Sequence, residues 1–120
     1  MYKEMKKVEL DLLTNKYTTV FQEKDFNYNA PHIFEVRDNE GNLLAGVNFQ
    51  EGPIGEAGVN GVMNEDLLAM VLVRLQSFQN SQFSCKENAM AITKIEEALL
   101  WLRKRTMGRE QRGVEGTHKL

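Results

Sequence analysis

The chain has 120 residues, a formal net charge of -2 at pH 7, and 42% hydrophobic and 27% charged residues. These values are typical of a soluble globular protein, with one domain or a small domain and an appended element, and they disfavour intrinsic disorder. The apolar runs are too short for a transmembrane helix, and the opening segment lacks the apolar block of a signal peptide. Because Cys85 is the single cysteine, we expect no disulfide, no cysteine-based zinc site and a reducing, cytoplasmic setting.

The first half of the chain predicts β structure. Residues 32–36 alternate in the manner of a half-buried strand, and residues 43–50 form a second apolar run. Residues 37–42 between them favour a turn, so we predict a β-hairpin. Residues 18–21 are expected to add a strand, whereas residues 8–13 fit a strand or a helix equally well.

A glycine-rich segment follows at residues 51–61, with Gly52, Pro53, Gly55, Gly58 and Gly61. This composition predicts a loop. Its glycines would let the backbone approach another chain or a ligand closely, although an ordinary surface connection explains the pattern as well.

The second half of the chain predicts two helices. Asn64 is expected to cap the first, which carries apolar residues at helical spacing as far as Phe78. After a break at residues 80–81, Ser84 and Glu87 form a capping box for the second helix. The short break predicts an antiparallel hairpin. The apolar seam of the second helix consists of Ile92, Ile95, Leu99 and Leu102.

Together these elements predict an α+β fold, in which a small N-terminal antiparallel β part is followed by a C-terminal antiparallel helical hairpin. We expect the β part to span residues 1–62 and the hairpin, with a basic C-terminal end, residues 63–120, packed as one compact unit. The apolar helix faces exceed what a small sheet can cover, which favours a homo-oligomer.

Positive charge gathers at the end of this acidic chain. Residues 101–120 contain six basic residues against Glu110 and Glu115. Arg105, Arg109 and Arg112 follow at steps of four and three, so they share one helix face. Guanidinium groups bind phosphates bidentately, which suggests a pyrophosphate or phosphodiester site. A solvated helix end, where basic residues suit the helix dipole, is the alternative.

Aromatic and amide side chains flank the break between the helices. Phe78 and Phe83, with Asn80 and Asn88 nearby, offer a stacking surface and hydrogen-bonding groups for a purine. The alternative is a core residue followed by a hydrophobic staple. A helix rises 1.5 Å per residue, so Asn88 and Arg109 are about 30 Å apart. A small ligand that touches both would need a site shared between antiparallel chains.

Enzyme signatures are scarce. Neither His32 nor His118 has a second histidine or cysteine at metal-ligand spacing, and no nucleophile, Walker or dinucleotide-binding motif is present. Glu96 and Glu97 are adjacent on a helix, so their carboxylates point in different directions. We therefore expect no catalytic activity, no metal and no cofactor.

Residues 86–101 are similar to the hairpin domain shared by the phage anti-Thoeris and anti-CBASS nucleotide sponges, with A-x-T-K-x-E-E-A-x-x-W as the most specific part. With residues 32–36, 49–54, 58–61 and 112–118, the chain resembles the Thoeris anti-defence one family. The resemblance covers about three quarters of the chain.

The resemblance implies a phage protein that binds glycocyclic ADP-ribose signals in the cytoplasm of the infected host without cleaving them, so that the Thoeris effector stays inactive. Family members form dimers to hexamers, and some also bind cyclic oligonucleotides at a separate site. Gly55 stands where a lysine is expected, which weakens any contribution of its loop to such a second site.

The resemblance also implies a set of ligand-binding residues. The purine-stacking aromatic and its neighbouring asparagine match Phe78 and Asn88. The phosphate-binding arginines match Arg105 and Arg109. The remaining candidates are Arg112, Thr117 and His118.

A nucleic-acid-binding or assembly module of a phage or prophage is the competing interpretation, with the basic helix end on backbone phosphates. Nucleic-acid binders usually spread basic residues over a broad patch and have a high pI. Here the pI is about 5.7 and the basic residues are confined to one end, which disfavours nucleic acid as a partner.

Overall fold

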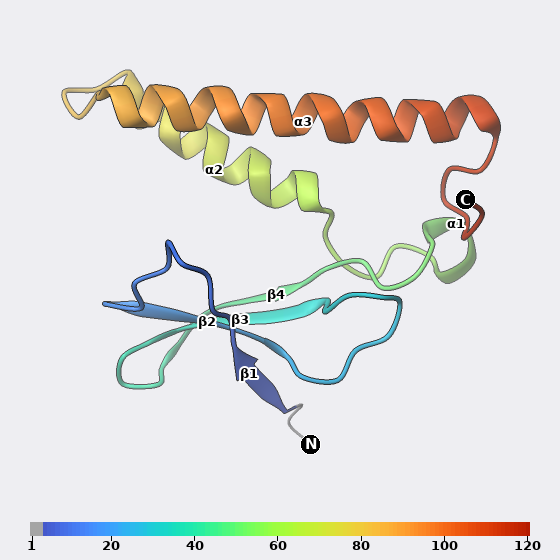
Figure 1. Cartoon of the computed structure of the whole chain (residues 1–120), viewed down its shortest axis with the longest axis horizontal. Helices are drawn as coiled ribbons and strands as arrows, with labels where there is room; N and C mark the ends of the chain where they lie inside the picture. Colours follow the sequence, from blue (N-terminus) through green and yellow to red (C-terminus); the bar gives the residue numbers. More distant parts are fainter. Residues whose placement is uncertain (1–3) are drawn as a thin grey trace. The chain divides into compact units, whose positions relative to one another are not determined.

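The computed structural model describes residues 4–120 (Figure 1). The chain divides between Val62 and Met63 into two compact units, which are described in turn. The first unit contains a β-sheet and the second a helical hairpin, so the predicted α+β class is confirmed.

The sheet of the first unit is antiparallel, with strand order β1-β2-β3-β4. The predicted hairpin is formed by β3 and β4, and β2 contains the predicted strand at residues 18–21. Residues 8–13, which fitted a strand or a helix, belong to neither. The strands are β1 (Met5–Lys7), β2 (Thr18–Glu23), β3 (Ile33–Asp38) and β4 (Leu43–Asn48).

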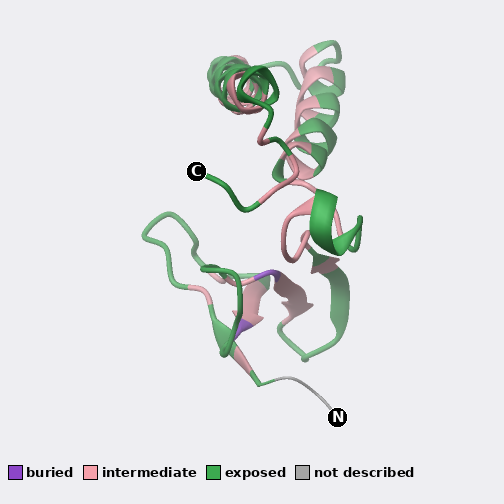
Figure 2. Cartoon of the chain, turned by 90° about the vertical axis from the view of Figure 1, so that its right-hand side faces the viewer, coloured by how far each residue is buried: buried purple, intermediate pink, exposed green. Residues whose placement is uncertain are grey.

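A buried carboxylate joins β2 to the start of β3. Glu23 is 1% exposed, and its Oε2 accepts hydrogen bonds from the backbone N–H groups of His32 at 2.8 Å and Ile33 at 2.9 Å. These donors offset the cost of removing the carboxylate from water. Figure 2 shows that the buried colour is confined to this unit, where Glu23 and His32 lie.

Asp38 closes the turn between β3 and β4. Its Oδ1 accepts from the backbone N–H groups of Asn42 and Glu40, both at 2.9 Å, and its Oδ2 accepts from the side-chain amide of Asn42 at 3.1 Å. These bonds, those from Asn42 foremost, hold the pKa of Asp38 below its ordinary value of 3.8. The turn is therefore ordered by local side-chain bonds, as its composition predicts.

The glycine-rich segment after β4 is not wholly loop, because it contains the single-turn helix α1 (Ile54–Ala57). Beyond that helix, Val62 forms an isolated parallel bridge with Phe49. A Cβ on Gly61 would lie 2.5 Å from the carbonyl carbon and oxygen of Phe49, so glycine is required there. The sequence predicted that these glycines let the backbone approach another chain or a ligand closely. At Gly61 the close approach is to the backbone of the same chain.

The second unit is an antiparallel hairpin of α2 (Asn64–Gln79) and α3 (Lys86–Arg112), as predicted (Figure 1). The predicted seam of α3, Ile92 to Leu102, is only half-buried. Among the described residues 4–120 no apolar side chain is fully buried. Within the hairpin, α2 and α3 therefore leave part of each other's apolar surface uncovered.

Both predicted helix caps are wrong by one residue. Met63, not Asn64, precedes α2, and the Asp66 carboxylate accepts from the Met63 N–H at 2.8 Å, so no side-chain cap from Asn64 is needed. Cys85, not Ser84, caps α3, and its Sγ accepts from the Asn88 N–H at 3.4 Å. The N–H of Ser84 bonds to the Ser81 carbonyl in the preceding turn, which delays the helix start.

Candidate functional site

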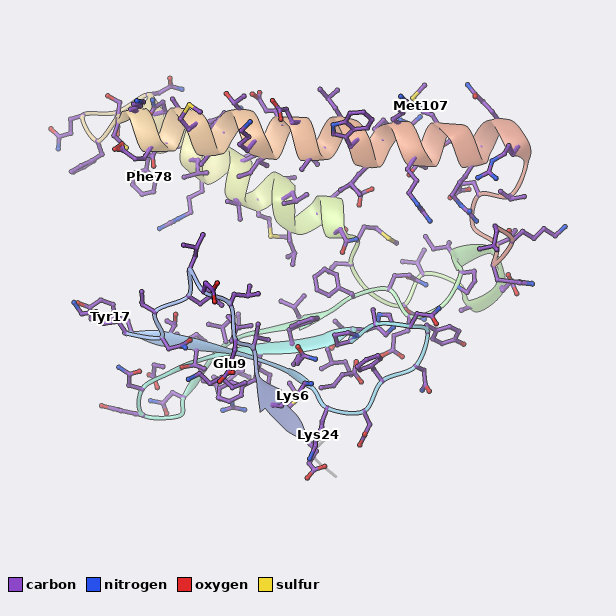
Figure 3. The ribbon with its side chains drawn as sticks, in the orientation of Figure 1. Lys6, Glu9, Tyr17, Lys24, Phe78 and Met107 are labelled. Atoms are coloured by element: carbon purple, nitrogen blue, oxygen red, sulfur yellow. The ribbon has the colours of Figure 1, made fainter. Side chains whose placement is uncertain are left out.

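The connection between α2 and α3 presents an aromatic ring. Phe78 lies in the last turn of α2, and Figure 3 shows it at the connection end of the hairpin. Its side chain is 39% exposed, and the guanidinium carbon of Arg74 lies 5.2 Å from the ring centroid. This cation–π contact engages one face of the ring. Phe83, in the connection itself, is 64% exposed.

Gln79 fixes the geometry of this end, a role that the sequence analysis missed. Its side-chain Oε1 accepts from the Cys85 N–H at 3.1 Å, and its Nε2 donates to the Cys85 carbonyl at 3.0 Å. This pair of bonds ties the last residue of α2 to the cap of α3. Phe78 and Asn88 stand on either side of that tie, and the Asn88 side chain makes no hydrogen bond within residues 4–120. The sequence signal for this role was a side-chain amide placed directly before the break between the two helices.

The opposite end of α3 carries a folded tail. Gly113 ends the helix in the left-handed region at φ 73°, with bonds from the Gly113 N–H to the Glu110 carbonyl and from the Val114 N–H to the Arg109 carbonyl, both at 3.0 Å. This Schellman pattern turns the chain back towards α3. Thr117 then donates its hydroxyl to the Val114 carbonyl at 2.6 Å.

Two arginines hold this tail. Nη2 of Arg109 lies 3.0 Å from the carbonyl oxygens of Val114 and Thr117 and 2.8 Å from that of Lys119. Nη1 of Arg112 donates to the backbone oxygen of Leu120 at 2.7 Å. The arginine cluster therefore has an internal structural role that the charge pattern did not predict.

The remaining basic residues differ in their pairing. Arg103 binds Glu110, with Nη1 3.1 Å from Oε1, whereas Arg105 makes no hydrogen bond or ion pair within the described part of the chain. Arg105 is also exposed. The guanidinium of Arg105 therefore has its N–H donors available to an anion.

The predicted site residues form two groups. Phe78, in the last turn of α2, and Asn88, in the first turn of α3, both lie at the connection end of the hairpin. The second group lies at the other end of α3 and consists of Arg105, Arg109, Arg112, Thr117 and His118. At 1.5 Å per residue Asn88 is about 25–36 Å along the helix from the three arginines, so one chain does not bring the two groups together.

A strip of residues runs along the C-terminal half of α3, over the same stretch of the helix as its arginines. Leu100, Trp101 and Met107 are 70%, 67% and 44% exposed, and Met107 is labelled in Figure 3. Nζ of Lys104 lies 5.0 Å from the Trp101 ring centroid. The α3 strip borders an open hollow of about 650 Å³ and consists of Glu97, Leu100, Trp101, Arg103, Lys104, Met107, Gly108 and Gln111.

Within 4–120, no three histidine, cysteine, aspartate or glutamate side chains gather as they would around a metal ion. No helix of that part of the chain is long and apolar enough to cross a bilayer.

Comparison with known proteins identifies the family of the chain. Residues 45–107, which include α2 and the part of α3 as far as Met107, match the family described as Acb2/Tad1, hairpin domain. A curated relative from Bacillus phage SBSphiJ7, named Thoeris anti-defense 1, is 52% identical over 142 aligned positions, which cover 96% of this chain and 99% of the relative. The alignment is longer than the chain, so the relative carries residues that this chain lacks. The chain belongs to the Acb2/Tad1 hairpin family.

Proposed function

We propose that this protein is a phage anti-defence sponge, which binds glycocyclic ADP-ribose signals in the cytoplasm of the infected host and releases them unchanged. A role in phage anti-defence is supported by the family and by the name of the relative. Sequestration would keep the signal from the Thoeris effector. No chemical step is needed for this function, because a bound ligand is removed from the free pool by mass action.

One observation carries the proposal: the hairpin has a partly exposed aromatic ring, Phe78, at one end and an exposed arginine, Arg105, at the other. A cyclic ADP-ribose has a purine and a pyrophosphate, which need these two kinds of group. Phe78 and Asn88 suit the purine and its hydroxyl groups, and Arg105 suits the pyrophosphate. Two antiparallel copies would place the two halves together, so the complete site lies between chains.

The charges on the α3 strip favour the same antiparallel arrangement. A two-fold axis between Leu100 and Trp101 would set Glu97 of each copy opposite Lys104 of the other. That register also sets Asn88 level with Gly113 of the second copy, because both pairs share one midpoint. Glu97 is available for this contact, since its exposed pair with Lys94, at 3.7 Å, is of the kind that contributes little.

Apolar burial would supply the driving force for this contact. Leu100 and Trp101 would meet their counterparts across the axis, and both are more than half exposed in the single chain. Aromatic side chains removed from water at the centre of an interface commonly dominate its energy. A homo-oligomer, from dimer to hexamer, is therefore part of the proposal.

The proposal is tested by native mass spectrometry of the protein with glycocyclic ADP-ribose isomers, cyclic oligonucleotides and a short single-stranded DNA. We expect a stable complex with a glycocyclic ADP-ribose, and the same nucleotide mass after the complex is heated. Preference for DNA would support the nucleic-acid module instead. A cleaved nucleotide with repeated turnover would show an enzyme, and no binding to any cyclic nucleotide would refute the sponge.

A further inference from the structure

Arg109 directs one nitrogen at three backbone carbonyls. Its Nη2 contacts the oxygens of Val114, Thr117 and Lys119 at 3.0, 3.0 and 2.8 Å. An Nη2 group has two hydrogens, so one of them is shared between two acceptors. Arg109 is half-buried, which protects these charge-assisted bonds from competition by water. Both hydrogens of Nη2 are therefore engaged by the chain's own tail.

This engagement removes the bidentate grip of Arg109. A guanidinium offers two parallel pairs of N–H groups, one from Nε with Nη2 and one from Nη1 with Nη2, because Cδ closes the third edge. Both pairs need Nη2. While the tail is in place, Arg109 can offer an anion only single N–H groups, which lack the geometric specificity of the planar fork.

The neighbouring arginines keep a fork. Arg105 has all its donors available within the described residues, and Arg112 uses Nη1 for the Leu120 oxygen, which leaves its Nε–Nη2 pair. Arg105 is four residues, about one turn, from Arg109. The roles of these arginines are therefore distinguishable by structure, although their spacing alone makes them equivalent.

We infer that Arg109 is a positioning residue that holds residues 113–119 against the end of α3, and that the bidentate contacts to the ligand's phosphates come from Arg105 and Arg112. The second half of this inference rests on the proposed function. Thr117 belongs with Arg109, since its hydroxyl donates to Val114 and accepts from the Lys119 N–H at 3.3 Å.

The positioning role is tested without ligand, by amide hydrogen exchange in Arg109→Ala, Arg109→Lys and Arg105→Ala. We expect Arg109→Ala to lose at least about 10-fold of the protection of the Thr117 and Lys119 amides, because their acceptors lose their anchor. Arg109→Lys should keep most of it, since an ammonium also donates to carbonyls. Arg105→Ala should match the parent protein. Unchanged protection in Arg109→Ala would overturn the inference.

The division of roles is tested with glycocyclic ADP-ribose. We expect Arg109→Lys to bind within about 3-fold of the parent protein, and Arg105→Lys to bind at least about 10-fold more weakly, because lysine lacks the planar fork. The reverse order would make Arg109 the phosphate clamp. If the parent protein fails to bind, the proposed function falls, and the exchange measurement still decides the positioning role of Arg109.

Discussion

Arg103 and Glu110 form a two-point ion pair across two turns of α3, with Nη1 3.1 Å from Oε1 and Nη2 3.4 Å from Oε2. The pair neutralises a guanidinium only two residues from the unpaired Arg105. The basic end of the hairpin is therefore less positive than its composition suggests, and Glu110 decides how much of the charge an approaching anion meets.

Glu110→Gln should strengthen nucleotide binding. Removing the carboxylate frees Arg103, and we expect about 2- to 5-fold tighter binding at low salt, in line with the modest energies of exposed ion pairs. The gain should vanish near 0.5 M salt, where screening is strong. Titration calorimetry at two salt concentrations measures this. An equal gain at both concentrations would mean that Glu110 acts through the structure and not through charge.

Phe78→Ala should weaken nucleotide binding by about 1–3 kcal/mol, or about 5- to 150-fold, through lost stacking. Phe83→Ala is the matched control, because it removes a more exposed ring from the same connection. Binding is measured by calorimetry, and circular dichroism confirms that both variants keep their helices. Equal losses in the two variants would remove Phe78 from the site.

Mixing two defective variants should restore binding. Phe78→Ala and Arg105→Ala each damage a different half of the site, so each alone should bind poorly. After unfolding and refolding together, some assemblies should pair an intact Phe78 from one chain with an intact Arg105 from another. Native mass spectrometry identifies mixed assemblies and their ligand content. Mixed assemblies that remain empty would argue that each site is built within one chain.

Reversing one charge on the α3 strip should weaken assembly, and reversing its partner charge as well should restore it. Lys104→Glu would face Glu97 of the second copy with like charge, and we expect a lower association constant by sedimentation. The double variant Glu97→Lys, Lys104→Glu restores opposite signs and should recover assembly. Glu96→Lys is the control outside the strip. If the double variant is no better than Lys104→Glu, the antiparallel register is wrong.

Replacing the thiol cap of α3 should change stability in a predictable order. Sulfur is a weak acceptor, so Cys85→Ser should raise the free energy of unfolding by about 0.5–1 kcal/mol, whereas Cys85→Ala should lower it. Urea unfolding of both variants at one protein concentration measures the difference. An alanine variant as stable as the serine variant would show that the 3.4 Å contact to Asn88 contributes nothing.

The elements with regular periodicity could be predicted from the sequence. Alternation identified β3, the turn residues identified its connection to β4, and spacing identified both helices. The helix starts were displaced because short-range bonds decided them: Asp66 serves α2, and Cys85 serves α3 in place of Ser84. Residue propensity favours serine as a helix cap. It does not take into account that the Ser84 N–H already bonds to the Ser81 carbonyl in the preceding turn.

The candidate site could be predicted only as residue types. Spacing placed Arg105, Arg109 and Arg112 on one face, but it assigned them equal roles. Their difference comes from a tail whose carbonyls reach Arg109 and Arg112, and carbonyl groups leave no trace in a side-chain pattern. An amide directly before the helix break pointed to Gln79, but its partners are backbone groups of Cys85, which no side-chain pattern identifies.

The length of α3 sets the capacity of the proposed sponge. Each chain would supply an aromatic half-site at one end of the helix and a basic half-site at the other. In a closed assembly in which every aromatic half-site pairs with a basic half-site of another chain, the number of complete binding sites then equals the number of chains. The amount of nucleotide that can be bound in a host cell would depend on the number of protein copies translated. It would not depend on whether those copies form dimers or larger closed assemblies.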